Sequence, residues 1–276
     1  MGRTAGKPPR VAVLGAGRMG RELIAVLADC EDARLSGVWT RSPGGLREAL
    51  GPGHDELLRS CDVTGDLDAV LRGADVAIDF TLPAATPGIL EAAGRLARPL
   101  VCGVSGLDDA VLGGLEALAR ELPVFYDRNM SYGIAVITEL VERAAAALGP
   151  EFVAEVHETH HVHKRDAPSG TALMLGEALA AARGADLETV FRYDAGGSPR
   201  RASPADIVFL VRREGEVPGE HTVVFRSPAE TLELAHRVRN RRVFAEGAVR
   251  AAKWLIEQPP GLYRMRDLAA EIAPDR

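Results

Sequence analysis

Aromatic side chains and cysteines are both scarce in this chain of 276 residues. Phe, Trp and Tyr make up 5% of the sequence, so aliphatic side chains must form most of any core. The hydrophobic content of 46% is ordinary for a globular protein. The three cysteines, Cys30, Cys61 and Cys102, lie far apart and are odd in number. These features argue against a disulfide framework or a cysteine-based zinc site, and they favour a reducing compartment.

The sequence also lacks a basic excess and a long apolar run. The formal net charge is −6, so nucleic acid is not expected as the main partner. No apolar stretch approaches the length of a membrane span, and the N-terminus MGRTAGKPPR does not resemble a signal peptide. We therefore expect a cytoplasmic protein that does not bind a membrane.

Short apolar runs alternate with helical stretches up to about residue 130. This alternation predicts βαβ units and an α/β fold with a doubly wound parallel sheet of the Rossmann type. The helix after the first strand is expected to bury one side, made of Leu23, Ile24, Leu27 and Ala28. The expected strands lie at 11–14, 34–42, 74–83, 98–106 and 122–129, and the later helices at 84–96 and 108–121.

The pattern changes after Asn129, where a long helix is expected over 133–148. Strand-like segments follow at 151–158, 205–213, 220–227 and 230–238, with a helix at 170–183. The last three strands have no helices between them, which predicts an α+β domain with a mixed or antiparallel sheet. A final helix, 244–258, is expected to return to the first domain. The predicted domains are therefore 1–130 with 241–276, for a dinucleotide, and 131–240, for substrate and oligomer contacts.

The segment GAGRMG places Gly15, Gly17 and Gly20 directly after the first strand and at the start of a helix. In this spacing the first glycine allows a tight turn and the second lets the backbone approach a pyrophosphate. The third allows close packing of helix on strand. The free N–H groups of the helix N-terminus attract the phosphates. The motif predicts a dinucleotide site, and a purely structural glycine turn is the alternative.

The end of the second expected strand indicates which dinucleotide binds. A carboxylate there would bind the ribose 2′-hydroxyl of NAD, but this chain has Thr40 followed by Arg41. Arginine can pair with the 2′-phosphate of NADP, so NADPH is favoured over NADH. The alternative is that Arg41 is an ordinary solvated side chain.

Four of the seven histidines lie in the stretch HETHHVHKRDAPSGTAL, which covers residues 157–173. The spacing of these histidines matches no standard zinc motif, and the neighbouring Lys164 and Arg165 would repel a cation, so no metal is expected. Ser169 is instead a plausible helix N-cap, with the N–H groups of Gly170 and Thr171 free to bind an anion. Together with Lys164 and a histidine as proton donor, this arrangement suits a small dicarboxylate. A polar loop that merely caps a helix is the alternative.

The segment HHVHKRDAPSGTAL closely resembles the signature HH-x-x-K-x-DAPSGTA of the 4-hydroxy-tetrahydrodipicolinate reductases, also called dihydrodipicolinate reductases. Further segments resemble this family in the same order, so the resemblance covers nearly the whole chain. These segments are the glycine loop, AIDFT (77–81), CGVSG (102–106), NMSYG (129–133), GEHTVVF (219–225) and FAEGAVRAAKWL (244–255).

The resemblance implies a cytoplasmic, NAD(P)H-dependent enzyme of lysine biosynthesis by the diaminopimelate route, usually a homotetramer. It implies that His160 donates a proton of near-neutral pKa with Lys164 as catalytic partner, and that His161, Gly170 and Thr171 bind substrate carboxylates. The implied cofactor residues are Gly15, Ala16, Gly17, Arg18, Met19, Gly20 and Arg41 at the phosphates, with Gly103, Val104, Ser105, Asp127, Arg128, Asn129 and Met130 at the nicotinamide end.

The chain departs from the family pattern in several segments outside the core motif. Its glycine loop is one residue shorter than in many members, CGVSG replaces GTTG, and Thr40 stands where an acidic residue is usual. SPADIVFLVRREG and DRNMSYG also differ from the common pattern. Two other functions therefore remain open: a related oxidoreductase that reduces another cyclic imine or dicarboxylate, and a non-enzymatic dinucleotide sensor.

Overall fold

The computed structural model describes residues 7–149, 151–194, 203 and 205–272, which form two compact units. The first unit runs to Ser131 and resumes at Arg242, and the second is Tyr132–Arg241. Each boundary lies one residue after the predicted position. The Pro/Gly/Ser-rich stretch 194–206 falls mostly outside the described residues.

The first unit is built on a seven-stranded sheet in which every neighbouring pair is parallel. The strand order confirms the prediction of a doubly wound sheet, because the chain starts in the middle and builds outward in both directions. In spatial order the strands are β12 (Gly261–Tyr263), β6 (Pro123–Tyr126), β5 (Leu100–Cys102), β4 (Val76–Asp79), β1 (Arg10–Leu14), β2 (Arg34–Trp39) and β3 (Asp62–Thr64).

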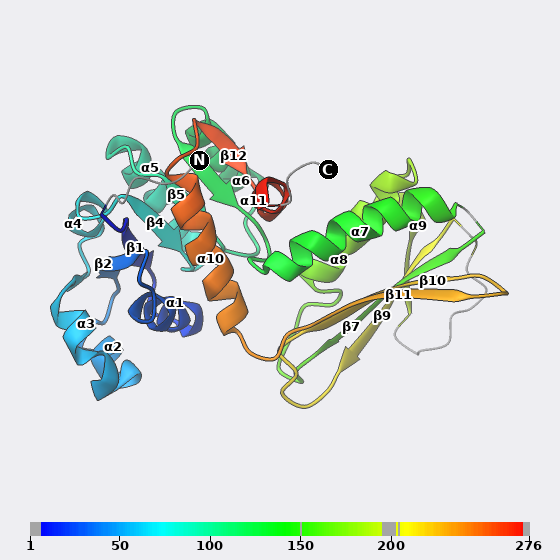
Figure 1. Cartoon of the computed structure of the whole chain (residues 1–276), viewed down its shortest axis with the longest axis horizontal. Helices are drawn as coiled ribbons and strands as arrows, with labels where there is room; N and C mark the ends of the chain where they lie inside the picture. The colour runs from blue at the N-terminus through cyan, green and yellow to red at the C-terminus, as the bar shows by residue number, and fades with distance from the viewer. Residues whose placement is uncertain (1–6, 150, 195–202, 204, 273–276) are drawn as a thin grey trace. The chain divides into compact units, whose positions relative to one another are not determined.

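Helices cover this sheet, and Figure 1 shows α10 running beside β4 and β5. The helix α1 (Arg18–Ala28) packs against α10 (Arg242–Leu255), which buries a face rich in alanine. The remaining helices of the unit are α2 (Pro43–Leu50), α3 (Asp55–Arg59), α4 (Leu67–Arg72), α5 (Thr86–Arg95), α6 (Asp109–Ala119) and α11 (Met265–Ile272), with 3₁₀ turns at Pro52–His54 and Pro83–Ala85.

The strand β1 is apolar because both of its faces are covered. Val11, Ala12, Val13 and Leu14 are all fully buried, as expected for a central parallel strand. On α1, Leu23, Ile24 and Leu27 are buried as predicted, but Ala28 is exposed and Val26 is buried in its place. The prediction for Ala28 was wrong: it is the last residue of the helix, and the buried face of the last turn is made by Val26 and Leu27.

The second unit contains a five-stranded mixed sheet, which confirms the predicted architecture. Its strand order is β11 (Thr231–Arg237), β10 (Glu220–Arg226), β7 (Val153–His160), β9 (Ile207–Arg213) and β8 (Phe191–Asp194). β7 pairs antiparallel with β10 and parallel with β9, so the central strand of this sheet is the one that carries the histidine-rich segment.

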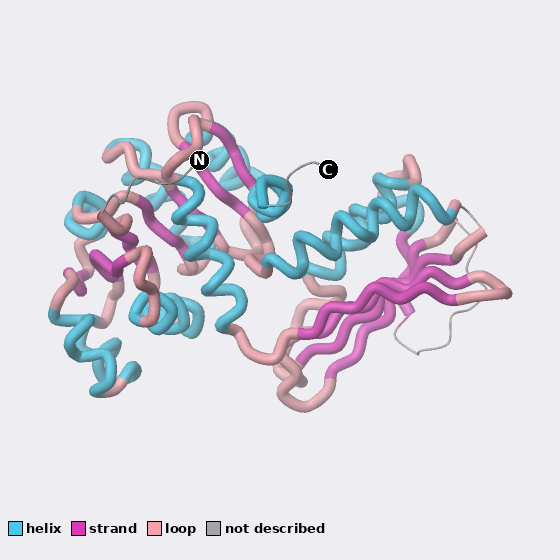
Figure 2. Tube along the Cα trace, in the orientation of Figure 1, coloured by secondary structure: helices cyan, strands magenta, loops and turns pink. Residues whose placement is uncertain are grey.

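Two long helices, α7 (Tyr132–Leu148) and α8 (Gly170–Ala182), pack on one face of this sheet, and α9 (Leu187–Val190) lies beside α8 (Figures 1 and 2). The core between helices and sheet includes Ala154, Val156, Phe209 and Phe225. No described helix of the second unit covers the other face of the sheet. Side chains alternate along β7, so Glu158 and His160 lie on the helix-covered face with Ala154 and Val156.

Three short strands were not predicted from the sequence, nor were the helices α2, α3, α4, α9 and α11. One of these strands, β8, has four residues and pairs with β9. β3 and β12 have three residues each, and neither contains an apolar run. They pair with edges that the longer strands provide, so their existence depends on neighbours distant in sequence. No helix within the described ranges is long and apolar enough to cross a membrane.

Candidate functional site

The glycine loop takes the conformation that its three glycines permit. Gly15 has a φ of +97°, which favours glycine, and its N–H donates to the carbonyl of Trp39. Gly17 is the N-cap of α1 and has no side-chain cap, so the first N–H groups of that helix are available to a ligand. A Cβ at Gly20 would lie 1.9 Å from the carbonyl oxygen of Gly15, whereas one at Gly17 would meet nothing within 4 Å. Gly20 therefore permits α1 to pack closely on the backbone of Gly15, and Gly17 leaves open space at the N-terminus of the helix.

A cavity of about 700 Å³ opens beside this loop, at the carboxyl ends of β1, β2 and β4. It lies where the strand order reverses between β1 and β4, which is the usual ligand position in such sheets. The volume is in the range of cofactor sites. The residues that line it include Gly15, Ala16, Gly17, Thr40, Arg41, Phe80 and Thr81.

The end of β2 supplies the polar wall of this cavity. Thr40 is buried, and its hydroxyl accepts a hydrogen bond from the N–H of Ser42 at 3.2 Å. Arg41 is exposed and lines the cavity. Among the described residues that line it, none is acidic. The cavity thus offers a cation and hydroxyl groups in the place where a carboxylate would bind an unmodified ribose.

A buried carboxyl group lies at the end of β4, directly before Phe80 and Thr81. Oδ1 of Asp79 accepts from the N–H of Thr81 at 2.8 Å, while Oδ2 is buried without a hydrogen-bond partner. Burial raises the pKa of Asp79 to about 6. Sequence reasoning included this residue only within the AIDFT resemblance and gave it no role.

The remaining predicted cofactor residues are not among those that line the cavity. Gly103 packs under Phe80, since a Cβ there would lie 2.4 Å from the ring. Val104 and Met130 are buried, whereas Arg18, Ser105 and Arg128 are exposed. Asp127 accepts from the backbone N–H groups of Asn129 and Met265, so its carboxylate organises the chain around β6 and α11.

In the second unit the structure separates the four clustered histidines. His157 faces the other side of the sheet, where its Nε2 lies 2.7 Å from Glu155. His163 is exposed, 3.3 Å from Glu216. His161 is partly buried and accepts from Arg241 at 3.3 Å. His160 alone is buried on the helix-covered face.

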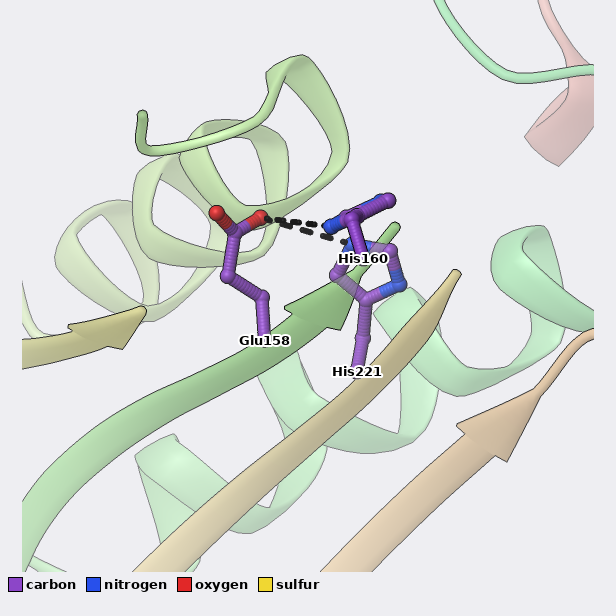
Figure 3. A group of neighbouring side chains, drawn as sticks. All are labelled: Glu158, His160 and His221. Atoms are coloured by element: carbon purple, nitrogen blue, oxygen red, sulfur yellow. Dashed lines mark ion pairs between the residues drawn. The ribbon is translucent and has the colours of Figure 1, made fainter. Parts of the chain in front are cut away.

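A buried carboxylate, Glu158, lies behind His160 on the same strand (Figure 3). Its Oε2 accepts from the N–H of Ser169 at 3.0 Å, and its Oε1 accepts from both terminal nitrogens of Arg213 at 3.2 Å. Nδ1 of His160 lies 3.5 Å from Oε2 and has no hydrogen bond of its own. The carboxylate is thus fixed by three donors beside the imidazole.

A second buried imidazole, His221, completes this group. Its ring meets that of His160 edge to face, with ring centroids 5.1 Å apart. Its Nε2 lies 3.2 Å from Oγ of Ser169, which in turn accepts from the N–H of Ala172 and so caps α8. The predicted N-cap is therefore correct, and the same hydroxyl links α8 to β10.

Burial is the main influence on both imidazoles. Burial first, and then the charges of Lys164 and Arg213, lower the pKa of His160 to about 4. Burial likewise lowers the pKa of His221 to about 3. A near-neutral pKa suits a proton donor, but in the protein by itself burial and two nearby cations hold the pKa of His160 well below that range.

Lys164 is placed near His160 by the turn that follows β7. Its N–H donates to the carbonyl of His161, and its Nζ lies 2.7 Å from Asp166. Arg213 donates to the carbonyls of Lys164 and Asp166 and so holds this turn against β9. Gly170 and Thr171 begin α8 as expected, with their N–H groups in its first turn.

The sequence analysis missed Glu158, Arg213 and His221. The alternation of strand side chains could have placed Glu158 beside His160. The other two depend on strand register, in which Arg213 is opposite His160 and His221 is opposite Glu158. That register could not be read from one segment.

These side chains also offer donor atoms to a cation, because the ligand atoms of Glu158, His160 and His221 all lie within 4.8 Å of one another. The zinc spacing rejected from the sequence concerned His160 and its neighbours in the chain, whereas this group joins His160 to Glu158 and to His221 of another strand. However, Arg213 already neutralises the carboxylate, and Lys164 adds a second positive charge nearby. With these two cations beside it, Glu158 is better suited to interact with a proton donor than to bind a metal ion.

Comparison with known proteins agrees with the two-unit architecture. Residues 9–130 match the family described as dihydrodipicolinate reductase, N-terminus, and residues 133–269 match dihydrodipicolinate reductase, C-terminus. The 4-hydroxy-tetrahydrodipicolinate reductase of Halorhodospira halophila is 41% identical over 263 residues, covering 94% of this chain and 97% of that protein. The enzyme of the same name from Alkalilimnicola ehrlichii is 42% identical over 264 residues, which cover 94% of this chain and 98% of that protein.

Solved structures show the same fold at lower identity. The dipicolinate-bound dihydrodipicolinate reductase of Paenisporosarcina sp. TG-14 superposes with a TM-score of 0.73 at 22% identity, covering 93% of this chain and 97% of that one. An amine dehydrogenase from Mycobacterium smegmatis superposes with a TM-score of 0.63 at 16% identity. The match covers 94% of this chain and 95% of that one. The family matches together span almost the whole chain, and the relatives match it at full length. The chain therefore belongs to the dihydrodipicolinate reductase family.

Proposed function

We propose that this protein reduces 4-hydroxy-tetrahydrodipicolinate to tetrahydrodipicolinate with NAD(P)H, as a step of lysine biosynthesis by the diaminopimelate route. The conversion uses one hydride and one proton, and the 4-hydroxyl oxygen leaves as water. The nicotinamide supplies the hydride, and His160 supplies the proton. The observation that carries this proposal is the buried His160 beside Lys164 and the N-terminus of α8, in a chain of this family.

The substrate's two carboxylates match the positive groups around His160. Lys164 provides a point charge, and the N–H groups of Gly170 and Thr171 lie at the positive end of α8. His161, which accepts from Arg241, adds a polar ring at the side of this group. Negative charge brought close to His160 opposes the effect of Lys164 and Arg213, so it raises the pKa of the imidazole towards the value that a proton donor needs.

NADPH is the cofactor that the cavity favours. Gly15 to Gly20 would hold the pyrophosphate at the N-terminus of α1, and Arg41 would pair with the 2′-phosphate. The N–H groups around Gly103–Ser105 and 127–130, which follow β5 and β6, would approach the nicotinamide end. The absence of a carboxylate among the described lining residues removes the usual partner of the NADH ribose.

The test is the loss of NADPH absorbance with substrate generated in situ from pyruvate and aspartate semialdehyde by the preceding synthase. Rapid loss is expected only with both proteins present. His160→Gln should lower kcat by at least about a hundredfold with little change in KM, and Lys164→Ala should affect both. Unchanged rates in both variants would refute the assigned roles.

Cofactor preference has its own variant and control. Arg41→Ala should raise KM for NADPH by about tenfold or more and leave KM for NADH nearly unchanged, because one ion pair with a phosphate is lost. Arg120→Ala removes an exposed arginine at the end of α6 and should change neither value. Equal effects of the two substitutions would show that Arg41 does not bind the 2′-phosphate.

We also infer a homotetramer, formed through the sheet face of the second unit that no described helix of that unit covers. This face mixes apolar and polar side chains, including Leu210, Val224 and Thr222. Light scattering should give the mass of four chains of 29.4 kDa each. Leu210→Glu should lower that mass, whereas Leu140→Glu, at an exposed position of α7, should not.

A related oxidoreductase acting on another cyclic imine is the second candidate. The same fold occurs in the amine dehydrogenase described above, and CGVSG follows β5 where GTTG is common in the family. NADPH binding without turnover of the tetrahydrodipicolinate precursor would favour this candidate.

A further inference from the structure

The two ring nitrogens of His160 have different surroundings. Nδ1 is buried, has no hydrogen bond and faces Oε2 of Glu158 at 3.5 Å (Figure 3). Nε2 lies on the side of Gly219, where the absence of a side chain leaves space: a Cβ there would lie 3.2 Å from that nitrogen. The two nitrogens of His160 can therefore play different roles, Nδ1 towards Glu158 and Nε2 on the side of Gly219.

Glu158 itself is held in one orientation. Its side chain is 0% exposed, and each of its oxygens has a hydrogen-bond donor from a different element: Ser169 before α8 and Arg213 on β9. One of these donors is the guanidinium of Arg213, which forms an ion pair with the carboxylate. The residue thus presents a fixed negative charge to the back of the imidazole.

We propose that Glu158 is a positioning residue for His160, holding the proton on Nδ1 so that Nε2 faces the substrate as the proton donor. This inference rests on the proposed function. When Nε2 gives up its proton, the Nδ1–H tautomer remains, and Glu158 stabilises it. The same logic underlies carboxylate–histidine pairs in which the carboxylate sets the tautomer and does not itself become protonated.

The charges around His160 explain why such a partner is needed. Arg213 on β9 and Lys164 after β7 both oppose an imidazolium at His160, and His161 acts in the same direction. Asp166 favours it but is exposed and paired with Lys164. Glu158 is the buried negative charge of this group. Substrate carboxylates would offset the cations in front of the ring, and Glu158 acts behind it.

His221 fixes the angle of the ring. It packs edge to face on His160 and is held through Nε2 by Ser169, the residue whose N–H also binds Glu158. Ser169 therefore aligns both the carboxylate of Glu158 and the imidazole of His221. Movement of His160 out of this position would separate it from both.

The first test is Glu158→Gln, with Glu155→Gln as the matched control. Glu155 lies on the same strand, is 4% exposed and binds an arginine and a histidine, but it faces the other side of the sheet. We expect kcat of Glu158→Gln to fall by about tenfold to a thousandfold, with KM changed by less than about threefold. Glu155→Gln should have the oligomeric mass of the wild type, and with that mass it should retain the wild-type kcat.

Two further measurements separate positioning from a structural role. In Glu158→Gln the limb of the pH–kcat profile that reports loss of the acid should move to lower pH, because the imidazolium has lost its counter-charge. Nitrogen-15 chemical shifts of the His160 ring at pH 8 should show Nδ1–H in the wild type and a mixture of tautomers in the variant. A merely structural role would lower the melting temperature and leave both readouts unchanged.

The outcomes also separate this inference from the proposed function. If the wild type shows no reductase activity, the proposed function fails, and the nitrogen-15 shifts still test the effect of Glu158 on the tautomer. If the wild type is active and Glu158→Gln matches Glu155→Gln in kcat, pH profile and tautomer, the positioning role is wrong.

Discussion

Two glycines of one loop should respond in opposite ways to the same added methyl group. In Gly20→Ala the new Cβ would lie 1.9 Å from the carbonyl oxygen of Gly15 and 2.8 Å from its carbonyl carbon. Real contacts of this kind are essentially never closer than 3.0 Å, so a backbone displacement of about 1 Å is required. No flexible side chain is available to absorb it.

The magnitude follows from two opposing effects. Alanine is favoured over glycine inside a helix by about 1 kcal/mol. Overpacking of a close contact costs about 1 to 3 kcal/mol, and a contact with backbone belongs to the upper part of this range, about 2 to 3 kcal/mol. We therefore expect a net loss of about 1 to 2 kcal/mol for Gly20→Ala, which corresponds to a melting temperature lower by several degrees for a chain of this size.

Gly17→Ala should leave stability nearly unchanged and damage cofactor binding. Its Cβ meets nothing within 4 Å, and the residue has an extended backbone conformation that alanine also adopts. We expect the free energy of unfolding to change by less than about 1 kcal/mol. The Kd for NADPH should rise by about tenfold or more, because the methyl group occupies the space through which a pyrophosphate approaches the helix N-terminus.

The assay is thermal unfolding by circular dichroism together with fluorescence titration of NADPH. Gly113→Ala serves as control, since this exposed glycine of α6 also has open space around it and lies outside the cavity. It should gain up to about 1 kcal/mol of stability and bind NADPH normally. A normal Kd in Gly17→Ala, or wild-type stability in Gly20→Ala, would refute the reasoning about this loop.

Three further predictions concern buried groups. Asp79→Asn should be more stable than the wild type at pH 8 but not at pH 4 in urea unfolding. The folded-state pKa of Asp79 is raised to about 6, so the carboxyl favours folding at low pH and this contribution is lost as pH rises through that value. The stability of the wild type relative to His221→Asn should fall between pH 7 and pH 5. The reason is that a pKa of His221 lowered from 6.5 to about 3 favours folding above 6.5 and loses this effect as pH falls. Gly219→Ala should lower kcat by about tenfold, since its Cβ would crowd Nε2 of His160 at 3.2 Å, and it should also lower the melting temperature, since Gly219 has a φ of +159°. Wild-type kcat would show that this side of the ring is not used.

The features that the sequence determined by itself are local ones. The order strand, glycines, helix around Gly15–Gly20 specifies a turn whose backbone only glycine allows at two positions, so the motif could be recognised without any other segment. The cap of α8 by Ser169 is equally local, because its hydroxyl bonds the N–H of Ala172 three residues later. The fold class followed from the spacing of apolar runs, which reflects burial on one or two faces.

The tertiary structure alone decided which of the crowded side chains work together. Four histidines are adjacent in sequence, yet strand alternation sends His157 to the far face and leaves His160 buried beside Glu158. Arg213 and His221 join them only because β9 and β10 pair with β7 in one register. Register is set by packing across the whole sheet, and a shift of one residue would turn each of these side chains to the opposite face. The lowered pKa of His160 has the same origin, since burial and a cation 53 residues away in the chain both depend on that packing.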